Sequence, residues 1–258
     1  MGQTTTRTAA PSGTAPGTAV AVHVTGLIEQ TFTLVERLRH AAETSLRTVQ
    51  DKEKQALAAL APQVSAALGG LITGAGVITT PLADGLAAVE WWMVTGPGAR
   101  TRLDLDLDPA SDSFVDVGRQ TWFAVPRETG KRHVTGPYVD YVCAEQYTLT
   151  FSVPLIRDGV FAGIAGADVF VGDFERAIRP MLRSAGVPLA LVNTQGRIVA
   201  GNTAHHITGS LIREPHIRTA LQEAAVRQPV AQTLTGGVIL TPCENLPLAV
   251  LEWPVQTR

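Results

Sequence analysis

Acidic and aromatic side chains gather in the middle of the sequence, and their types suit the binding of a small molecule. Asp140 and Asp168 could pair with an ammonium group. Trp122, Tyr138 and Tyr141 could form walls that exclude water and offer cation–π contacts. The same stretch also holds groups able to grip a carboxylate, namely Arg119, Arg127, Arg132 and His133. These residue types favour a binding pocket over a catalytic centre.

Each of these residues also has a purely structural interpretation. Asp168 ends an apolar strand pattern, where a carboxylate is costly unless paired, and Arg127 could supply that pairing. Asp140 could cap a turn, and Trp122 could belong to the core. Trp91 and Trp92 are consecutive, so on a strand they point to opposite faces. One of them would line the pocket while the other packs against a helix, and we assign Trp92 to the pocket.

The sequence contains no motif of a familiar catalytic centre. G-x-S-x-G, G-x-x-x-x-G-K-[ST] and H-E-x-x-H are absent, and Gly74-Ala-Gly-Val carries only half of a dinucleotide fingerprint. We therefore predict no enzyme activity, no catalytic residues and no cofactor. The rival hypothesis is a hydrolase or lyase that uses Asp168 and His133. It requires the two side chains to lie within hydrogen-bond reach in one cleft.

Alternating aspartates at positions 104, 106 and 108 raise the question of a metal site. The pattern Arg102-Leu-Asp-Leu-Asp-Leu-Asp predicts a half-buried strand. On a strand these carboxylates stand in a row roughly 7 Å apart, too far to share one ion, whereas calcium-binding carboxylates lie on a loop that wraps the ion. His205 and His206 have no carboxylate or cysteine placed to complete a site. We predict no bound metal.

Length and composition narrow the class of protein. The 258 residues are 45% hydrophobic, enough for one large domain or two small ones. The formal net charge of −2 gives no basic surplus for nucleic acid. Cys143 and Cys243 are predicted to be reduced thiols. No signal peptide is evident, and no apolar run approaches the roughly 20 residues that cross a bilayer. These features predict a cytoplasmic protein without membrane contact.

A long helix is predicted behind a short leader. Residues 1–18 are rich in Thr, Ala, Gly and Pro and are expected to be disordered. Over residues 19–68, apolar side chains recur at spacings of three and four, among them Val24, Ile28, Val35, Leu38, Ala42 and Leu46. So long an apolar stripe needs a partner surface. Either a sheet of its own domain or a second copy of the chain would supply it, so a homodimer is one of two alternatives.

The remaining sequence predicts two units built from strands and short helices. In the first, residues 69–183, a hairpin crosses the turn Arg157-Asp158-Gly159 and its second strand ends at Asp168. In the second and smaller unit, residues 184–258, two strands surround the turn at 194–196, a helix follows at 212–225, and two more strands close the chain. The fold class is therefore α+β.

The order of these elements and motifs resembles a double Cache sensor domain. The features that carry the resemblance are the long helix, the pair Trp122-Phe123, Gly136-Pro137-Tyr138-Val139-Asp140 and the strand ending Gly166-Ala-Asp-Val-Phe. Leu191-Val-Asn-Thr-Gln-Gly-Arg-Ile-Val-Ala resembles the second module. The resemblance spans roughly residues 20–258. It implies two PAS-like antiparallel-sheet modules stacked along the N-terminal helix.

The resemblance also implies a site in the first module. In amino-acid-binding members, an aromatic, an Arg, a Trp-aromatic pair, a Tyr and an Asp bind the ligand. The matching positions in this sequence are Phe114, Arg119, Trp122, Phe123, Tyr138 and Asp168. Arg119 lies three residues before Trp122 instead of two, and Gln120 occupies the family position. If no Arg reaches the pocket, an amine or polyamine is favoured over an amino acid.

Together these inferences predict a small-molecule sensor. The first module would recognise an amino acid, an amine or a small carboxylate metabolite. The second module and the long helix would transmit the signal or form a homodimer. We expect the signal to pass to a separate protein, such as a transcription regulator.

Overall fold

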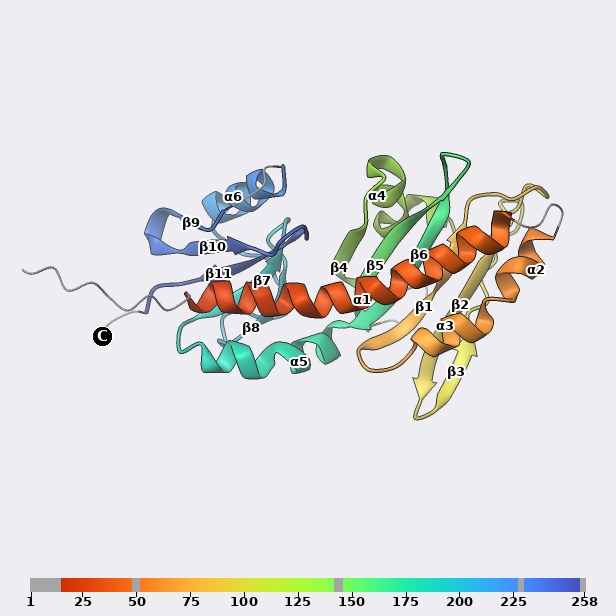
Figure 1. Ribbon diagram of the computed structural model, residues 1–258. Coiled ribbons are helices and arrows are strands. Elements are labelled where there is room, and N and C mark those ends of the chain that lie inside the picture. The colour runs from red at the N-terminus through yellow and green to blue at the C-terminus, as the bar shows by residue number, and fades with distance from the viewer. Residues whose placement is uncertain (1–14, 48–51, 142–145, 227–229, 256–258) are drawn as a thin grey trace, which may run out of the picture.

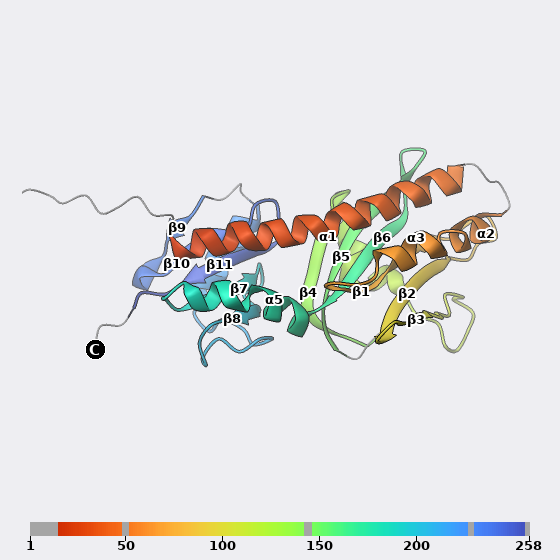
Figure 2. The same ribbon diagram turned by 60° about the horizontal axis from the view of Figure 1, so that its bottom comes forward.

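A computed structural model describes residues 15–47, 52–141, 146–226 and 230–255. Two antiparallel sheets lie side by side along one long helix, α1 (Figures 1 and 2). The first sheet has the strand order β3-β2-β1-β6-β5-β4, and the second has the order β8-β7-β11-β10-β9. We call the two sheets, with the helices that cover them, the first and second modules. The predicted boundary at 183/184 falls at the end of α5, between the last strand of one sheet and the first strand of the other.

Helix α1, Pro16–Arg47, joins the two modules into one body. Its buried positions recur every three or four residues, as the sequence predicted, and include Val24, Ile28, Val35 and Leu38. This stripe belongs to a core cluster that also contains Phe151 of the first sheet and Val250 of the second. The sheets of its own chain therefore supply the partner surface that the stripe needs.

Two of the expected boundaries near the N-terminus differ in the structure. The single helix expected over residues 19–68 is divided into α1, α2 (Glu53–Ala58) and α3 (Ala61–Ala67), with Pro62 in the first turn of α3. The leader expected over residues 1–18 lies mostly outside the described residues, but residues 16–18 already belong to α1. Proline at the first position of a helix costs no hydrogen bond, which explains the early start.

The first module contains strands β1 to β6. Their bounds are β1 Ile72–Thr79, β2 Val89–Gly96, β3 Ala99–Arg102, β4 His133–Asp140, β5 Gln146–Arg157 and β6 Val160–Phe170. The predicted hairpin is β5–β6. Its turn places Asp158 and Gly159 at φ values of 52° and 79°, which an Asp-Gly pair tolerates. One face of the sheet packs on α1, and the other is covered by η1 (Val117–Arg119) and α4 (Thr121–Thr129).

The strand expected from Arg102 to Asp108 is not formed. Strand β3 ends at Arg102, and the next residues have no regular structure. The Asp106 carboxylate accepts hydrogen bonds from Ser111 Oγ, Ser113 Oγ and the Asp108 amide. Such local bonds compete with a strand ladder. The leucines at 103, 105 and 107 still pack inward on the cluster around Trp122, so the alternation correctly predicted burial but not the strand.

The second module is sandwiched between helices. Its strands are β7 Leu189–Asn193, β8 Ile198–Gly201, β9 Gln232–Thr233, β10 Ile239–Pro242 and β11 Leu248–Glu252. Helix α6, Pro215–Val226, covers one face with Ile217 and Leu221. Helix α5, Val171–Ser184, and α1 cover the other face. A short 3-10 helix, η2 (Thr235–Gly237), precedes β10.

Candidate functional site

A small cavity lies on the α4 side of the first sheet, and we call it the carboxylate cavity. Its volume is about 20 Å³, room for a single water molecule. It is lined by residues from β1, β2, β4, β5, β6, α4 and the segment after β3: Ile78, Trp91, Leu103, Leu105, Trp122, Tyr138, Asp140, Thr150 and Asp168. Four predicted site residues, Trp122, Tyr138, Asp140 and Asp168, therefore meet at one place.

Strand register brings Asp168 into the centre of this cavity. Asp168 on β6 is paired with Gly74 on β1 and with Thr150 on β5. Its side chain is buried, and Oδ1 accepts a hydrogen bond of 2.7 Å from the Thr150 hydroxyl. The Thr150 oxygen lies 2.8 Å from the hydroxyl of Tyr138 on β4. A chain of hydrogen bonds thus links the carboxylate to the edge strand of the sheet.

Burial dominates the electrostatics of Asp168. The pKa of Asp168 is raised to about 7, mainly by the loss of water around the carboxylate and to a smaller extent by the neighbouring charge of Asp140. The Thr150 hydroxyl and the Trp91 indole act in the opposite direction but offset only part of the effect. No arginine or lysine lines the cavity among the described residues. Arg127, the alternative structural partner for Asp168, does not line the cavity and lies 4.0 Å from Glu128.

Trp91, not Trp92, is the tryptophan of β2 that lines the cavity. The two side chains point to opposite faces, as predicted, but Trp92, which we assigned to the pocket, lies on the face of the sheet away from this cavity. Trp92 packs on the α1 side of the sheet, and its Nε1 donates to Glu90 Oε1 over 2.6 Å. The sequence alternation places the two side chains apart but cannot say which face carries the pocket.

The Trp91 indole N–H is buried and close enough to Asp168 to lower the pKa of that carboxyl, but it makes no hydrogen bond of ordinary geometry among the described residues. It lies beside Asp168 at the position of Gly74. A Cβ on Gly74 would be 3.0 Å from Asp168 Oδ2 and 3.1 Å from Trp91 Nε1. The missing side chain of Gly74 therefore leaves the space in which these two polar groups face each other. A buried donor without an acceptor is costly, and a bound group could satisfy it.

Phe123 and Arg119 lie outside the carboxylate cavity. Phe123 is buried behind Trp122 and packs edge-on against Phe161, with ring centroids 5.3 Å apart. The Arg119 side chain is 88% exposed and pairs with Asp116 over 3.0 Å. Phe114 is also exposed. Arg119, which is shifted by one residue from the family position in the sequence, thus lies on the surface in the structure.

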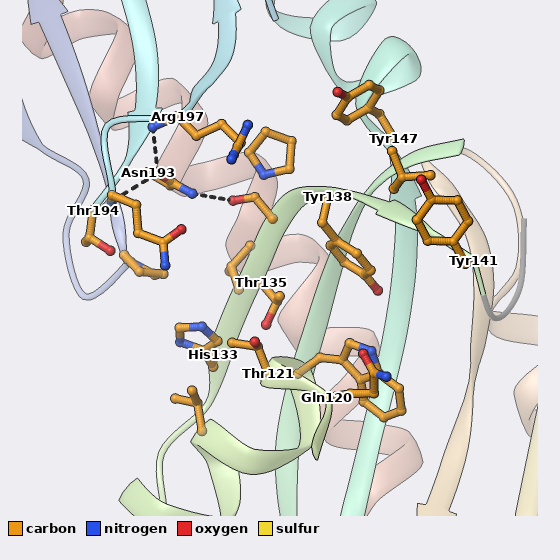
Figure 3. Close-up of a pocket in the computed structure, with 18 residues that line it drawn as sticks. Gln120, Thr121, His133, Thr135, Tyr138, Tyr141, Tyr147, Asn193, Thr194 and Arg197 are labelled. Atoms are coloured by element: carbon orange, nitrogen blue, oxygen red, sulfur yellow. Dashed lines mark hydrogen bonds between the residues drawn. The ribbon is translucent and has the colours of Figure 1, made fainter. Parts of the chain in front are cut away.

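A second and larger hollow, which we call the intermodule cleft, opens between β4, α4 and the β7–β8 turn (Figure 3). Its volume is about 570 Å³. The predicted site residue Tyr141, 81% exposed, lines this cleft and not the cavity. Asn193 of the second module donates from Nδ2 to the Gly136 carbonyl over 2.9 Å and so links the modules beside the cleft. Trp122 and Tyr138 line both hollows.

The geometry does not assemble the rival catalytic pair. His133 lines the intermodule cleft, whereas Asp168 lines the carboxylate cavity, and no hydrogen bond joins them. Burial lowers the pKa of His133. In the described part of the chain, no cluster of three or more His, Cys, Asp or Glu side chains could hold a metal ion. Cys243 is a buried free thiol, and Cys143 lies outside the described residues.

Comparison with known proteins identifies the fold. No protein-family model and no curated protein matches the sequence. Among solved structures, the extracellular domain of mmHK1S-Z3, a protein named as a putative histidine kinase, has a TM-score of 0.63 at 16% identity and covers 92% of this chain and 90% of its own.

Two chemoreceptor ligand-binding domains are similar as well. The domain of Pseudomonas fluorescens CtaA, in complex with L-valine, has a TM-score of 0.55 at 14% identity and covers 94% of this chain and 95% of its own. The domain of Pseudomonas aeruginosa PctC, in complex with GABA, has a TM-score of 0.52 at 19% identity and covers 91% and 95%. The chain thus has the fold of the extracellular sensor domains of chemoreceptors and histidine kinases. The predicted double Cache resemblance and the α+β class are confirmed as to fold.

The expectation of a cytoplasmic protein without membrane contact is not supported by these findings. Helix α1 is long and apolar enough to cross a membrane by length and composition, contrary to the expectation that no such run exists. The core helix of a soluble protein passes the same test, and α1 packs on both sheets here. The similar structures are described as extracellular domains or as chemoreceptor ligand-binding domains.

Proposed function

We propose that this chain is a small-molecule sensor whose first module binds the ammonium group of a metabolite in the carboxylate cavity. The observation that carries the proposal is Asp168, a fully buried carboxyl without a cationic partner among the described residues. A buried carboxylate is costly unless it is paired. An ammonium group would supply the missing charge.

The other walls of the cavity favour the same ligand chemistry. Trp91, Trp122 and Tyr138 offer aromatic faces, which attract a cation and exclude water. When the carboxylate is ionised, Asp168 can accept hydrogen bonds from Thr150, from the Trp91 N–H and from the ligand together. A ligand with only a carboxylate would meet two acidic side chains and no arginine or lysine of the described residues. We therefore favour an amine-bearing metabolite over a simple carboxylate.

The cavity must enlarge to admit any such metabolite. Its present volume of about 20 Å³ holds one water molecule. Leu103 and Leu105 come from a segment without regular structure, which makes this segment the wall that can move with the least loss of hydrogen bonds. Binding is therefore expected to order this segment in a new position.

The similar structures support a sensing role. L-valine and GABA, bound by CtaA and PctC, both carry an ammonium group. By analogy we propose that the domain samples the extracellular side and passes its signal to a kinase or chemotaxis partner. A separate transcription regulator and a homodimer through the exposed side of α1 remain alternatives, and light scattering at micromolar concentration tests the dimer.

A thermal-shift screen tests the proposed function. Ligands that bind only the folded state raise the melting temperature by mass action. We expect amines to raise it, and we expect Asp168→Asn to lose that response while Asp112→Asn, at an exposed position, retains it. Amino acids, organic acids, polyamines and purines complete the screen. If no compound carrying an ammonium group moves the transition, the proposal is wrong.

A further inference from the structure

Charge is distributed unequally between the two hollows of the first module. The carboxylate cavity is lined by Asp140 and Asp168 and by no arginine or lysine of the described chain. The intermodule cleft has the opposite composition. Its described lining contains Arg197 and the titratable His133 but no aspartate or glutamate. A negative end and a positive end therefore lie next to each other.

The two hollows share two lining residues. Trp122 from α4 and Tyr138 from β4 line both of them. Figure 3 shows Tyr138 between the cleft residues of the second module and the end of β4. A side-chain rotation requires far less energy than separation of the sheet strands. Movement of the Tyr138 ring away from Thr150 would connect the cavity to the cleft.

The lining of the cleft can receive a polar group. Thr135 carries a buried hydroxyl with no hydrogen-bond partner among the described residues. Arg197 uses one guanidinium nitrogen, Nη1, to donate to the Gly209 carbonyl over 2.6 Å. That bond anchors the arginine, and its other nitrogens face no carboxylate of the described chain. A guanidinium fixed in this way is suited to bind an anionic group.

We propose that the cavity and the cleft are the two ends of one site, which binds an amine and a carboxylate joined by an extended aliphatic chain. The ammonium end lies at Asp168, and the carboxylate end lies at Arg197, so the second module contributes directly to recognition. The inference rests on the proposed function, because it assumes that the ammonium group binds at Asp168. An α-amino acid satisfies the site poorly, since its two charges are separated by a single carbon.

Titration calorimetry with a matched set of probes tests this inference. The probes are δ-aminovalerate, ε-aminocaproate, n-pentylamine and L-valine. We expect one of the two amino acids with separated charges to bind about tenfold or more tightly than n-pentylamine, which has the ammonium but no anion. L-valine is expected to bind more weakly than that amino acid.

Variants of Arg197 test whether the second module causes the difference in affinity between the separated-charge amino acid and n-pentylamine. Arg197→Gln should lower the affinity for the separated-charge amino acid about tenfold and leave the affinity for n-pentylamine unchanged. Arg197→Lys should retain part of the preference because it keeps the charge. Arg119→Gln, which removes an exposed arginine outside both hollows, is the matched control and should change nothing.

The outcomes separate this inference from the proposed function. Equal binding of n-pentylamine and both separated-charge amino acids, or equal losses for all probes in Arg197→Gln, would overturn the inference and leave an amine sensor. Failure of every probe and every amine to bind would instead overturn the proposed function. If Arg197→Gln does not fold, the salt dependence of binding to the wild-type protein tests the inference. Added salt should lower the affinity for the separated-charge amino acid more than the affinity for n-pentylamine, and an equal decrease would overturn the inference.

Discussion

The Asp168 carboxylate lies 2.7 Å from the Thr150 hydroxyl in a space that holds one water molecule. The hydroxyl satisfies one carboxyl oxygen but supplies no charge. Ionisation of Asp168 is therefore unfavourable, and burial raises the pKa of this carboxyl to about 7. A protein that kept this group only for stability would be better served by a neutral side chain.

Asp168→Asn should stabilise the protein above neutral pH. The folded pKa of Asp168, about 7, is above its unfolded value of 3.8, so its contribution is fully present below pH 3.8 and is lost as the pH rises through 7. The difference in unfolding free energy between variant and wild type should therefore grow by up to about 4 kcal/mol between acidic and alkaline pH. Urea unfolding at about pH 5 and about pH 8 should detect about 3 kcal/mol of this difference, because the rest develops between pH 3.8 and about pH 5.

The matched control for this measurement is Asp112→Asn, which changes an exposed carboxylate. Its difference from wild type should not vary with pH in the same way. A pH-independent stability difference for Asp168→Asn would show that the carboxyl is ionised at all the pH values tested and would contradict the raised pKa.

Amine binding should strengthen with rising pH and then level off. Only the ionised form of Asp168 pairs with an ammonium group, so below pH 7 the affinity should rise about tenfold per pH unit. Above pH 7 it should become constant while the amine stays charged. Calorimetry in two buffers of different ionisation enthalpy should also detect protons released on binding near neutral pH. Affinity that is constant from acidic to neutral pH would place the ammonium elsewhere.

Three glycine-to-alanine substitutions should have three different effects. Gly76→Ala would place a Cβ 2.2 Å from the Glu90 carbonyl oxygen and should destabilise the protein severely. Gly74→Ala meets the flexible Met93 sulfur at 2.5 Å as well as the cavity groups, so it should lower amine affinity more than stability. Gly26→Ala, in open space on α1, should add up to about 1 kcal/mol of stability.

Thermal unfolding and calorimetry on the same three variants separate these effects. Gly26→Ala serves as the control for handling and expression, since it touches neither hollow. Normal amine affinity in a folded Gly74→Ala variant would show that the space between Asp168 and Trp91 is not used by the ligand.

Asn193→Asp should weaken the link between the two modules. The Asn193 Oδ1 atom accepts from the amides of Gln195 and Arg197, and an aspartate can keep both bonds. The aspartate cannot donate to the Gly136 carbonyl, so the intermodule bond is replaced by repulsion, with a cost of about 1–3 kcal/mol. Scanning calorimetry should show a broader transition or two transitions. A single, unshifted transition would mean that this bond does not couple the modules.

The sequence predicts those parts of the fold that depend on local patterns. The stripe of α1, the β5–β6 hairpin and the opposite faces of Trp91 and Trp92 all follow from periodicity and turn chemistry. The length of α1 did not follow, because residues 52–67 continue a helical pattern in two separate helices. The alternation after Arg102 also led to a wrong prediction of a strand, since the side-chain hydrogen bonds of Asp106 outweigh strand propensity there.

The site could be predicted in part, for a physical reason. Tyr138, Asp140 and Asp168 are conspicuous because polar or acidic residues at buried strand positions demand an explanation. Thr150, Trp91 and Arg197 carry no such signal. Their positions in the two hollows arise from register across the four strands β2, β1, β6 and β5 and from the approach of the second module, which no local pattern encodes.

The length of α1 limits how the two modules can move. Its N-terminal amide at Gly17 donates to Glu252 of the second sheet, and near its other end the Glu43 carboxylate accepts from the Ile156 amide of the first sheet. Because α1 is one continuous helix bonded to both sheets, sliding of one module along it would break these hydrogen bonds. Rotation of one module about the axis of α1 would instead change the width of the intermodule cleft. If the proposed function is correct, we expect ligand binding to change the angle between the modules and not their separation along the helix.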